Sequence, residues 1–252
     1  DECCDWYGSV LAVSPSNPGV LFVGAGSMAQ SADGGVTWNF AGGYGLPPGG
    51  GTNLHPDQHA IAFSADGATM YVATDGGVYK TSNPAGPNFN WQSLNATIST
   101  ITFYNGLAID PTDVQRALGG TQDNGTNRYT GSLTWTSNAW CGDGGYSAFD
   151  FTNPQIDYSA CGANQGIAKT LDGGVNYAAA DAGIITSDRQ AWVPPLVMDP
   201  SNAQVLYWGT YRVYQTTDGA ASWVPISGDL TGGSGAVTTV AIAPTDSNTV
   251  YV

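Results

Sequence analysis

The chain has 252 residues, 42% of them hydrophobic, and it carries a formal net charge of −14 with only 6 Lys and Arg. This charge excludes nucleic acid and anionic membrane surfaces as partners. No apolar run is long enough to span a bilayer, which excludes membrane insertion by a helix. The hydrophobic content suffices for a folded core, and neutral or cationic ligands suit the charge best.

The composition predicts an almost all-β protein. Of the 20 acidic residues only Glu2 is a glutamate, and the chain contains 35 Gly and 14 Pro. Residues that fill helix surfaces are therefore scarce, whereas residues that form turns are abundant. The 28 aromatic residues (Trp 8, Tyr 13, Phe 7) supply the bulk of a core despite the glycine content.

A short motif recurs along the chain and divides it into units. It runs from Ser31 to Trp38, from Thr170 to Tyr177 and from Thr216 to Trp223, and degenerate copies end at Trp91 and Trp135. The closing aromatics follow one another roughly every 40 to 50 residues, the length of one four-stranded propeller blade. Five complete units are predicted.

A two-strand pattern precedes each motif, in which an apolar strand, a Pro or Asp-Gly turn and a second strand follow one another. Copies begin at Val10, His59, Gly106, Tyr146, Leu196 and Thr239. We therefore predict one β-propeller domain over 1–252, with blades of four antiparallel strands and five and a half blades in this chain. Its units are 1–38, 39–91, 92–135, 136–177, 178–223 and 224–252. A propeller closes its ring to protect its edge strands, so we expect a longer polypeptide or a neighbouring chain to supply the remaining blades of a six- to eight-bladed or tandem propeller.

The motif Ser/Thr-x-Asp-x-Gly-x-x-Trp resembles the Asp-box of BNR-repeat propellers, a superfamily that includes sialidases, xyloglucanase-type glycosidases and sortilin-like receptors. The chain is similar to bacterial secreted proteins of the "glycosyl hydrolase, BNR repeat" type through His55 to His59, Thr74 to Tyr79, Gly119 to Thr126 and Gly142 to Gly145. The resemblance implies a propeller fold and a bacterial or archaeal origin. It is weak for activity, because one fold hosts many functions.

The box residues have a structural interpretation. The Asp is expected to accept hydrogen bonds within the turn between a blade's third and fourth strands, the Gly to be left-handed, and the aromatic residue to pack between blades. We assign this role to Ser31, Asp33, Gly35, Trp38, Thr170, Asp172, Gly174, Tyr177, Thr216, Asp218 and Trp223.

Carboxylates and aromatics gather on the opposite face of the predicted propeller. Because strands alternate in direction, second-to-third strand turns and the connections between blades share one face. The residues expected there are Asp57, His59, Asp75, Asp123, Asp143, Trp6, Tyr104, Trp140 and Trp192. Rings that stack on sugars beside carboxylates are typical of carbohydrate sites.

Each of these residues also has a simpler interpretation. Asp75 and Asp143 lie in Asp-Gly-Gly, which is ordinary turn chemistry. Asp123 and Asn124 either form a turn or supply oxygen ligands for calcium, the one cofactor we consider. The only two histidines, His55 and His59, flank Asp57, so a metal site or a hydrogen-bonding role for His59 are both open.

The four cysteines match no zinc spacing, and an even number of them favours disulfides and an oxidising, extracellular or cell-surface location. Cys141 precedes the fourth blade's first strand and Cys161 ends its second strand. Both fall on the same face, so we predict a disulfide between them.

Two functions remain open at this stage. The first is an extracellular module that binds a polysaccharide or a protein, or serves as a scaffold. The alternative is a xyloglucanase-like glycoside hydrolase acting on a neutral polysaccharide, with Asp57 and Asp143 as the catalytic pair. Sialidase activity is disfavoured, because only Arg189 and Arg212 fall on the ligand face and a carboxylate-binding triad requires three arginines.

Overall fold

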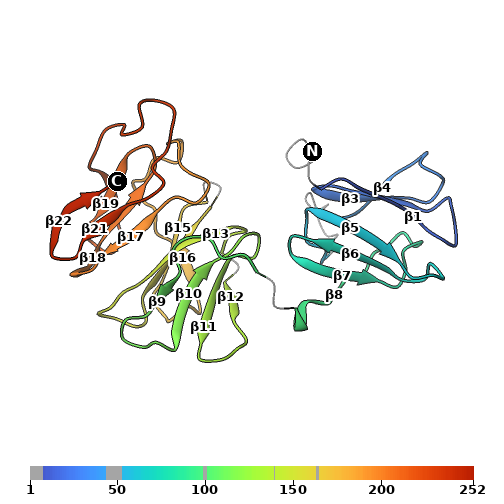
Figure 1. Cartoon of the computed structure of the whole chain (residues 1–252), viewed down its shortest axis with the longest axis horizontal. Helices are drawn as coiled ribbons and strands as arrows, with labels where there is room; N and C mark the ends of the chain where they lie inside the picture. The colour runs from blue at the N-terminus through green and yellow to red at the C-terminus, as the bar shows by residue number, and fades with distance from the viewer. Residues whose placement is uncertain (1–7, 44–52, 99–100, 139, 163–164) are drawn as a thin grey trace. The chain divides into compact units, whose positions relative to one another are not determined.

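The computed structural model describes residues 8–43, 53–98, 101–138, 140–162 and 165–252. Trp6, one of the predicted ligand-binding residues, lies outside the described residues, as do Cys3 and Cys4. The chain consists of two compact units, 1–100 and 101–252. Figure 1 shows antiparallel sheets in both. The expectation of a single domain over 1–252 stays a prediction.

The first unit contains two four-stranded antiparallel sheets, each with its strands in chain order. The first sheet comprises β1 (Val10–Val13), β2 (Leu21–Gly24), β3 (Ser27–Ser31) and β4 (Asn39–Gly43). The second comprises β5 (Gln58–Phe63), β6 (Met70–Thr74), β7 (Gly77–Thr81) and β8 (Gln92–Ser93), followed by the 3₁₀ turn η1 (Asn95–Thr97).

The second unit contains three four-stranded sheets and one two-stranded sheet. Its first sheet comprises β9 (Ala108–Ile109), β10 (Arg116–Gly120), β11 (Thr126–Thr130) and β12 (Thr136–Asn138). The second comprises β13 (Gly144–Phe149), β14 (Asp157–Cys161), β15 (Ile167–Thr170) and β16 (Tyr177–Ala179), and the third comprises β17 (Leu196–Asp199), β18 (Asn202–Gly209), β19 (Val213–Thr216) and β20 (Val224–Pro225). The two-stranded sheet comprises β21 (Ala241–Ala243) and β22 (Asp246–Tyr251).

These sheets confirm the predicted fold class, an all-β propeller of four-stranded antiparallel blades. Five full blades and the first two strands of a sixth occur in the described chain. No helix in the described residues has the length and apolarity needed to cross a membrane.

The cores lie between successive sheets of each unit. In the first unit Phe22 and Met28 of one sheet pack with Met70, Val72 and Trp91 of the next. In the second unit the largest core cluster joins the fourth and fifth blades, and its bulkiest members are Tyr158, Leu206, Trp208, Tyr214 and Trp223. Alternating burial along β2 and β6 follows the two-residue period of a strand.

The three full box motifs form the same hydrogen-bonded turn. Asp33 Oδ1 accepts the backbone N–H groups of Val36 at 3.0 Å and Thr37 at 2.9 Å, and Ser31 Oγ accepts Gly35 N–H at 2.8 Å. Asp172 and Asp218 are bonded in the same way by the residues that follow them. In the third motif the left-handed position after the glycine is filled by Ala220, with φ 65°.

The closing aromatics differ in their packing. Trp223 is 2% exposed and donates Nε1–H to Ala180 O of the preceding blade at 2.8 Å, as Trp91 does to Ala41 O at 2.8 Å. Trp38 instead is 42% exposed and donates to Gly35 O in its own turn. For Trp38, whose indole hydrogen-bonds locally, packing between blades stays a prediction, because no sheet precedes β1 among the described residues.

Candidate functional site

One edge of the second unit contains three of the predicted ligand-binding residues, Asp123, Trp140 and Trp192, together with Asp143. We call it the linker edge, and it comprises the described parts of the second-to-third strand turns (121–125, 162, 165–166 and 210–212) and of the connections between blades (140–143, 180–195 and 226–240). Strands of neighbouring blades meet here closely, because Gly125 N–H donates to Gly142 O at 2.7 Å and Gly144 N–H donates to Thr121 O at 3.0 Å. The second-to-third strand turn of one blade is thereby joined to the start of the next.

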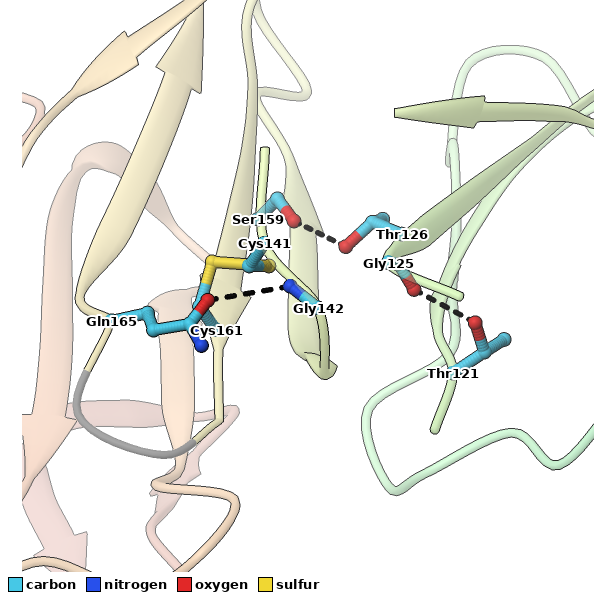
Figure 2. The surroundings of a disulfide bond; sticks show 8 residues. All are labelled: Thr121, Gly125, Thr126, Cys141, Gly142, Ser159, Cys161 and Gln165. Carbon is cyan, nitrogen blue, oxygen red and sulfur yellow. Dashed lines mark hydrogen bonds between the residues drawn. A yellow bond between two sulfur atoms is a disulfide. The ribbon is translucent and has the colours of Figure 1, made fainter. Parts of the chain in front are cut away.

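A disulfide fixes the loop that begins the fourth blade. Cys141 and Cys161 are bonded, with Cα atoms 5.9 Å apart and 20 residues of sequence separation. This is the predicted pairing, and both cysteines are buried. Figure 2 shows that Gln165 lies beside it and accepts Gly142 N–H through Oε1 at 3.3 Å. The backbone just before Asp143 is therefore held from two sides.

Asp143 is the centre of a chain of hydrogen bonds. It is 9% exposed and accepts Tyr104 O–H at 3.4 Å and Asp123 N–H at 3.2 Å. Tyr104 in turn accepts Trp192 Nε1–H at 3.3 Å. Burial raises the pKa of Tyr104, and the carboxylates of Asp143 and Asp123 add to this, so the phenol stays protonated and can donate.

A cavity of about 550 Å³ opens beside this chain, and we call it the Trp140 cavity. Its walls include the indole of Trp140, which is 38% exposed, and the side-chain amides of Asn124, Asn127 and Gln165. The one charged side chain on its wall is Asp123. An aromatic surface beside neutral amides is suited to a neutral ligand that carries many hydroxyl groups.

The turn proposed for calcium is closely hydrogen-bonded. Asp123 has φ 57°, a left-handed conformation that Asp tolerates in turns. Asn124 donates Nδ2–H to Gln122 O at 2.9 Å, and its carbonyl accepts Asn127 Nδ2–H at 3.2 Å and Ser137 O–H at 3.2 Å. Calcium binding at Asp123 and Asn124 stays a prediction.

The remaining predicted residues belong to the first unit. His59 Nε2 and Asp75 Oδ1 form a hydrogen bond, and Asp75 N–H donates to Asp57 O at 3.2 Å. Asp57 is 3% exposed and has φ 60°. Among the first unit's described residues, no three His, Cys, Asp or Glu side chains bring ligand atoms within 4.8 Å of one another.

The structure thus brings the predicted residues together in two sets. Tyr104, Asp123, Asp143 and Trp192 form one set in the second unit, with Trp140 on the adjoining cavity wall. His59, Asp75 and Asp57 form another in the first unit. The two predicted catalytic carboxylates, Asp57 and Asp143, are in different units, and their joint action stays a prediction.

Sequence reasoning missed the neutral polar residues of the linker edge. Asn127 and Gln165 carry no motif, and one polar amide in a turn or strand is common. Asp188 was also missed, although it is only 6% exposed and accepts hydrogen bonds from Arg212 Nε and Nη2, both at 2.8 Å. The one available signal was Arg212 itself, a rare cation on the predicted ligand face.

No protein-family model matches the sequence, and no curated protein matches it. Solved structures similar to the chain include an ancestral GH74 enzyme, with 17% identity over 94% of this chain and 33% of that one, and a TM-score of 0.42. The GH74 xyloglucanase from Xanthomonas campestris has 15% identity over 95% of this chain and 49% of its own, with a TM-score of 0.33. YCF48 bound to D1 peptide has 15% identity over 82% of this chain and 64% of its own, with a TM-score of 0.38.

The chain therefore spans between 33% and 64% of the length of these three proteins. Similarities of this size assign no activity or ligand to it.

Proposed function

We propose that the second unit is an extracellular binding module for a neutral, hydroxyl-rich saccharide, which it holds in the Trp140 cavity. The observation that carries this proposal is the placement of a partly exposed indole beside three side-chain amides in an open cavity of about 550 Å³. The disulfide between Cys141 and Cys161 supports an oxidising, extracellular location.

The chemistry of the walls favours a sugar over an ion or an apolar ligand. The indole of Trp140 offers an apolar face for stacking, and the amides of Asn127 and Gln165 offer both donors and acceptors. No Lys or Arg lies among the cavity's lining residues, whereas Asp123 does. An anionic ligand would meet this carboxylate without a compensating cation.

Asp143 is better suited to orienting a ligand than to transferring protons. Its carboxylate already accepts Tyr104 O–H and Asp123 N–H, so it holds Asp123, a residue of the cavity wall, in place. Glycoside hydrolysis by Asp57 and Asp143 remains the alternative function, and the binding of an extracellular protein remains a second class of partner.

The test is calorimetric titration of the full chain with neutral β-glucan oligosaccharides. Trp140→Ala is expected to weaken binding at least tenfold, because truncating an aromatic anchor costs about 2 kcal/mol. Val175→Ala is the matched control, since Val175 is 79% exposed and follows β15, at the opposite end of that strand from Gln165. Equal affinity of wild type and Trp140→Ala, or no binding by either, would contradict the proposal.

The wild-type chain and further single variants test the alternative hydrolase function and the predicted calcium site. Release of reducing ends by wild type that stops in both Asp57→Asn and Asp143→Asn would establish the hydrolase in place of the binding module. Repeating the titration after chelation and after adding calcium tests the ion predicted at Asp123 and Asn124. A calcium-dependent affinity that Asp123→Asn abolishes would support that site.

A further inference from the structure

A second cavity lies on the linker edge of the same unit. It has a volume of about 590 Å³ and is formed by the connection from β16 to β17 and the connection from β20 to β21. Its lining includes the hydroxyls of Thr186, Ser187 and Ser234, the amide of Gln190 and the guanidinium of Arg189. We call it the Gln190 cavity.

Arg189 lines this cavity and Arg212 binds Asp188, another lining residue, and each guanidinium is already paired with a carboxylate. Arg189 Nη2 donates to Asp229 Oδ2 at 2.8 Å. Arg212 holds Asp188 through two nitrogens, and Asp188 also accepts Tyr214 O–H at 2.6 Å. Both guanidinium groups lie over the ring of Tyr211, at 4.6 and 4.5 Å from its centroid.

The paired charges cancel, so these arginines do not form an anion site. An acidic ligand in the cavity would have to displace Asp229 from Arg189, and it would also meet the carboxylate of Asp188 on the wall. Asp188 accepts from both Arg212 and Tyr214, and losing these bonds would leave its buried carboxylate unpaired. The cavity is therefore suited to a ligand without charge.

Gln190 adds a specific requirement for a hydrogen-bond donor. Its Oε1 is buried and has no hydrogen-bond partner among the described residues. A buried acceptor that lacks a donor is unfavourable, and a ligand hydroxyl in the cavity would supply one. The hydroxyls of Ser187 and Ser234 on the walls can donate to or accept from the same ligand.

Trp192 belongs to a loop that lines the Gln190 cavity, and hydrogen bonds link it to the wall of the Trp140 cavity. It lies two residues after Gln190 in the same loop and is 60% exposed. Its Nε1–H donates to Tyr104, whose hydroxyl donates to Asp143, and Asp143 accepts Asp123 N–H on the wall of the Trp140 cavity. The loop that contributes Gln190 to one cavity is thereby linked by hydrogen bonds to Asp123 on the wall of the other.

We propose that the Gln190 cavity is a second subsite for the same neutral saccharide, so that one linear oligosaccharide occupies both cavities and crosses Trp192. This inference rests on the proposed function, because the Trp140 cavity is the first subsite. In this second subsite Gln190 Oε1 accepts a hydrogen bond from a sugar hydroxyl, and only a ligand long enough to reach Gln190 forms this bond.

The experiment compares a short and a long ligand. Cellobiose, cellohexaose and a hexameric oligogalacturonate are titrated into the full chain and into Gln190→Ala, Ser234→Ala, Trp140→Ala and Val175→Ala. Cellohexaose is expected to bind wild type more tightly than cellobiose. Gln190→Ala should lower the cellohexaose affinity about five- to tenfold, the effect of losing one ligand hydrogen bond, and leave cellobiose unchanged.

The outcomes separate this inference from the function on which it rests. If Trp140→Ala weakens both ligands while Gln190→Ala and Ser234→Ala weaken neither, the second subsite is refuted and the saccharide-binding function stands. If wild type binds neither neutral ligand, the function itself fails. Tighter binding of oligogalacturonate than of cellohexaose would overturn the argument from paired charges. Unchanged thermal midpoints in the variants exclude misfolding as the cause of a lost affinity.

Discussion

Arg128 in β11 and Asp157 in β14 form a buried ion pair between two successive blades, with Nη2 and Oδ2 2.5 Å apart. Their side chains are 9% and 0% exposed. Tyr177 O–H also donates to Asp157, at 2.5 Å, and its oxygen accepts Arg128 Nη2–H at 2.8 Å. Burial, reinforced by the Asp157 carboxylate, raises the pKa of Tyr177, which keeps this phenol protonated.

Removing one partner of this pair should be strongly destabilising. Arg128→Ala leaves a buried carboxylate without its cation, and we expect a loss of about 3 to 5 kcal/mol in the free energy of unfolding. Urea unfolding followed by tryptophan fluorescence measures it. The double variant Arg128→Met with Asp157→Leu removes both charges and should lose less than Arg128→Ala; a larger loss in the double variant would contradict this account.

Two glycines at equivalent positions of the box turns allow the contact of Arg128 with Asp157 and Tyr177 to be tested against a matched control. Gly35 and Gly174 both have φ 93°, so alanine is strained equally at each. A Cβ at Gly35 would lie 3.8 Å from Trp38, its nearest neighbour, whereas at Gly174 it would lie 2.1 Å from Arg128 Nη2.

Gly35→Ala should therefore cost about 1 to 2 kcal/mol, the price of the backbone conformation alone. Gly174→Ala should cost more, because it must also displace Arg128 from Asp157 and Tyr177. Unfolding of both variants in urea provides the comparison. Equal losses would show that Arg128 moves aside freely and that its ion pair adds little.

The sequence was sufficient to predict features that repeat locally. Gly35 and Asp33 occur in a turn whose hydrogen bonds close within a few residues, so the motif marks each blade without tertiary information. Cys141 and Cys161 were paired correctly because strand alternation alone places both at one edge of the same blade.

Features that depend on the neighbouring sheet could not be predicted in this way. Trp38 and Trp223 close the same motif, yet they are 42% and 2% exposed. The indole of Trp223 reaches a carbonyl of the preceding blade, whereas that of Trp38 bonds within its own turn. Gln190 was likewise missed, since the burial of its Oε1 results from two loops that are distant in the sequence.

Acid should destabilise the protein through the box turns. Hydrogen bonds from Thr37 and Ser31 lower the pKa of Asp33 to about 2, and Asp172 and Asp218 have pKa values of about 2 for the same reason. A folded-state pKa below the unfolded value of about 3.9 contributes stability that is present above the unfolded value and is lost as the pH falls toward the folded one.

We therefore expect the thermal midpoint to hold from pH 7 to about pH 4 and to fall between about pH 4 and pH 2. Differential scanning calorimetry across this range measures it. Asp172→Asn removes one of the three carboxylates and should make the thermal midpoint fall less steeply between about pH 4 and pH 2, while leaving the other box turns intact. A slope that is identical in wild type and Asp172→Asn would show that other carboxylates dominate acid unfolding.

Opening the disulfide should weaken ligand binding as well as stability. Closing a loop of this size contributes about 3 kcal/mol to the free energy of unfolding, so Cys141→Ser with Cys161→Ser lowers the urea midpoint. The loop from Trp140 to Asp143 also loses its covalent attachment to β14. Because Trp140 and Gly142 line the cavity, the variant should bind cellobiose several-fold more weakly in conditions where it is fully folded.

Reduction of the wild-type protein with a thiol provides a second route to the same state. Circular dichroism in the titration buffer establishes that the reduced protein and the double variant remain folded, and Val175→Ala again serves as the control for an exposed change near the same blade. If both disulfide-free forms are folded and bind with wild-type affinity, the loop is held in place by Gln165 and the strand ladder, and the disulfide contributes to stability alone.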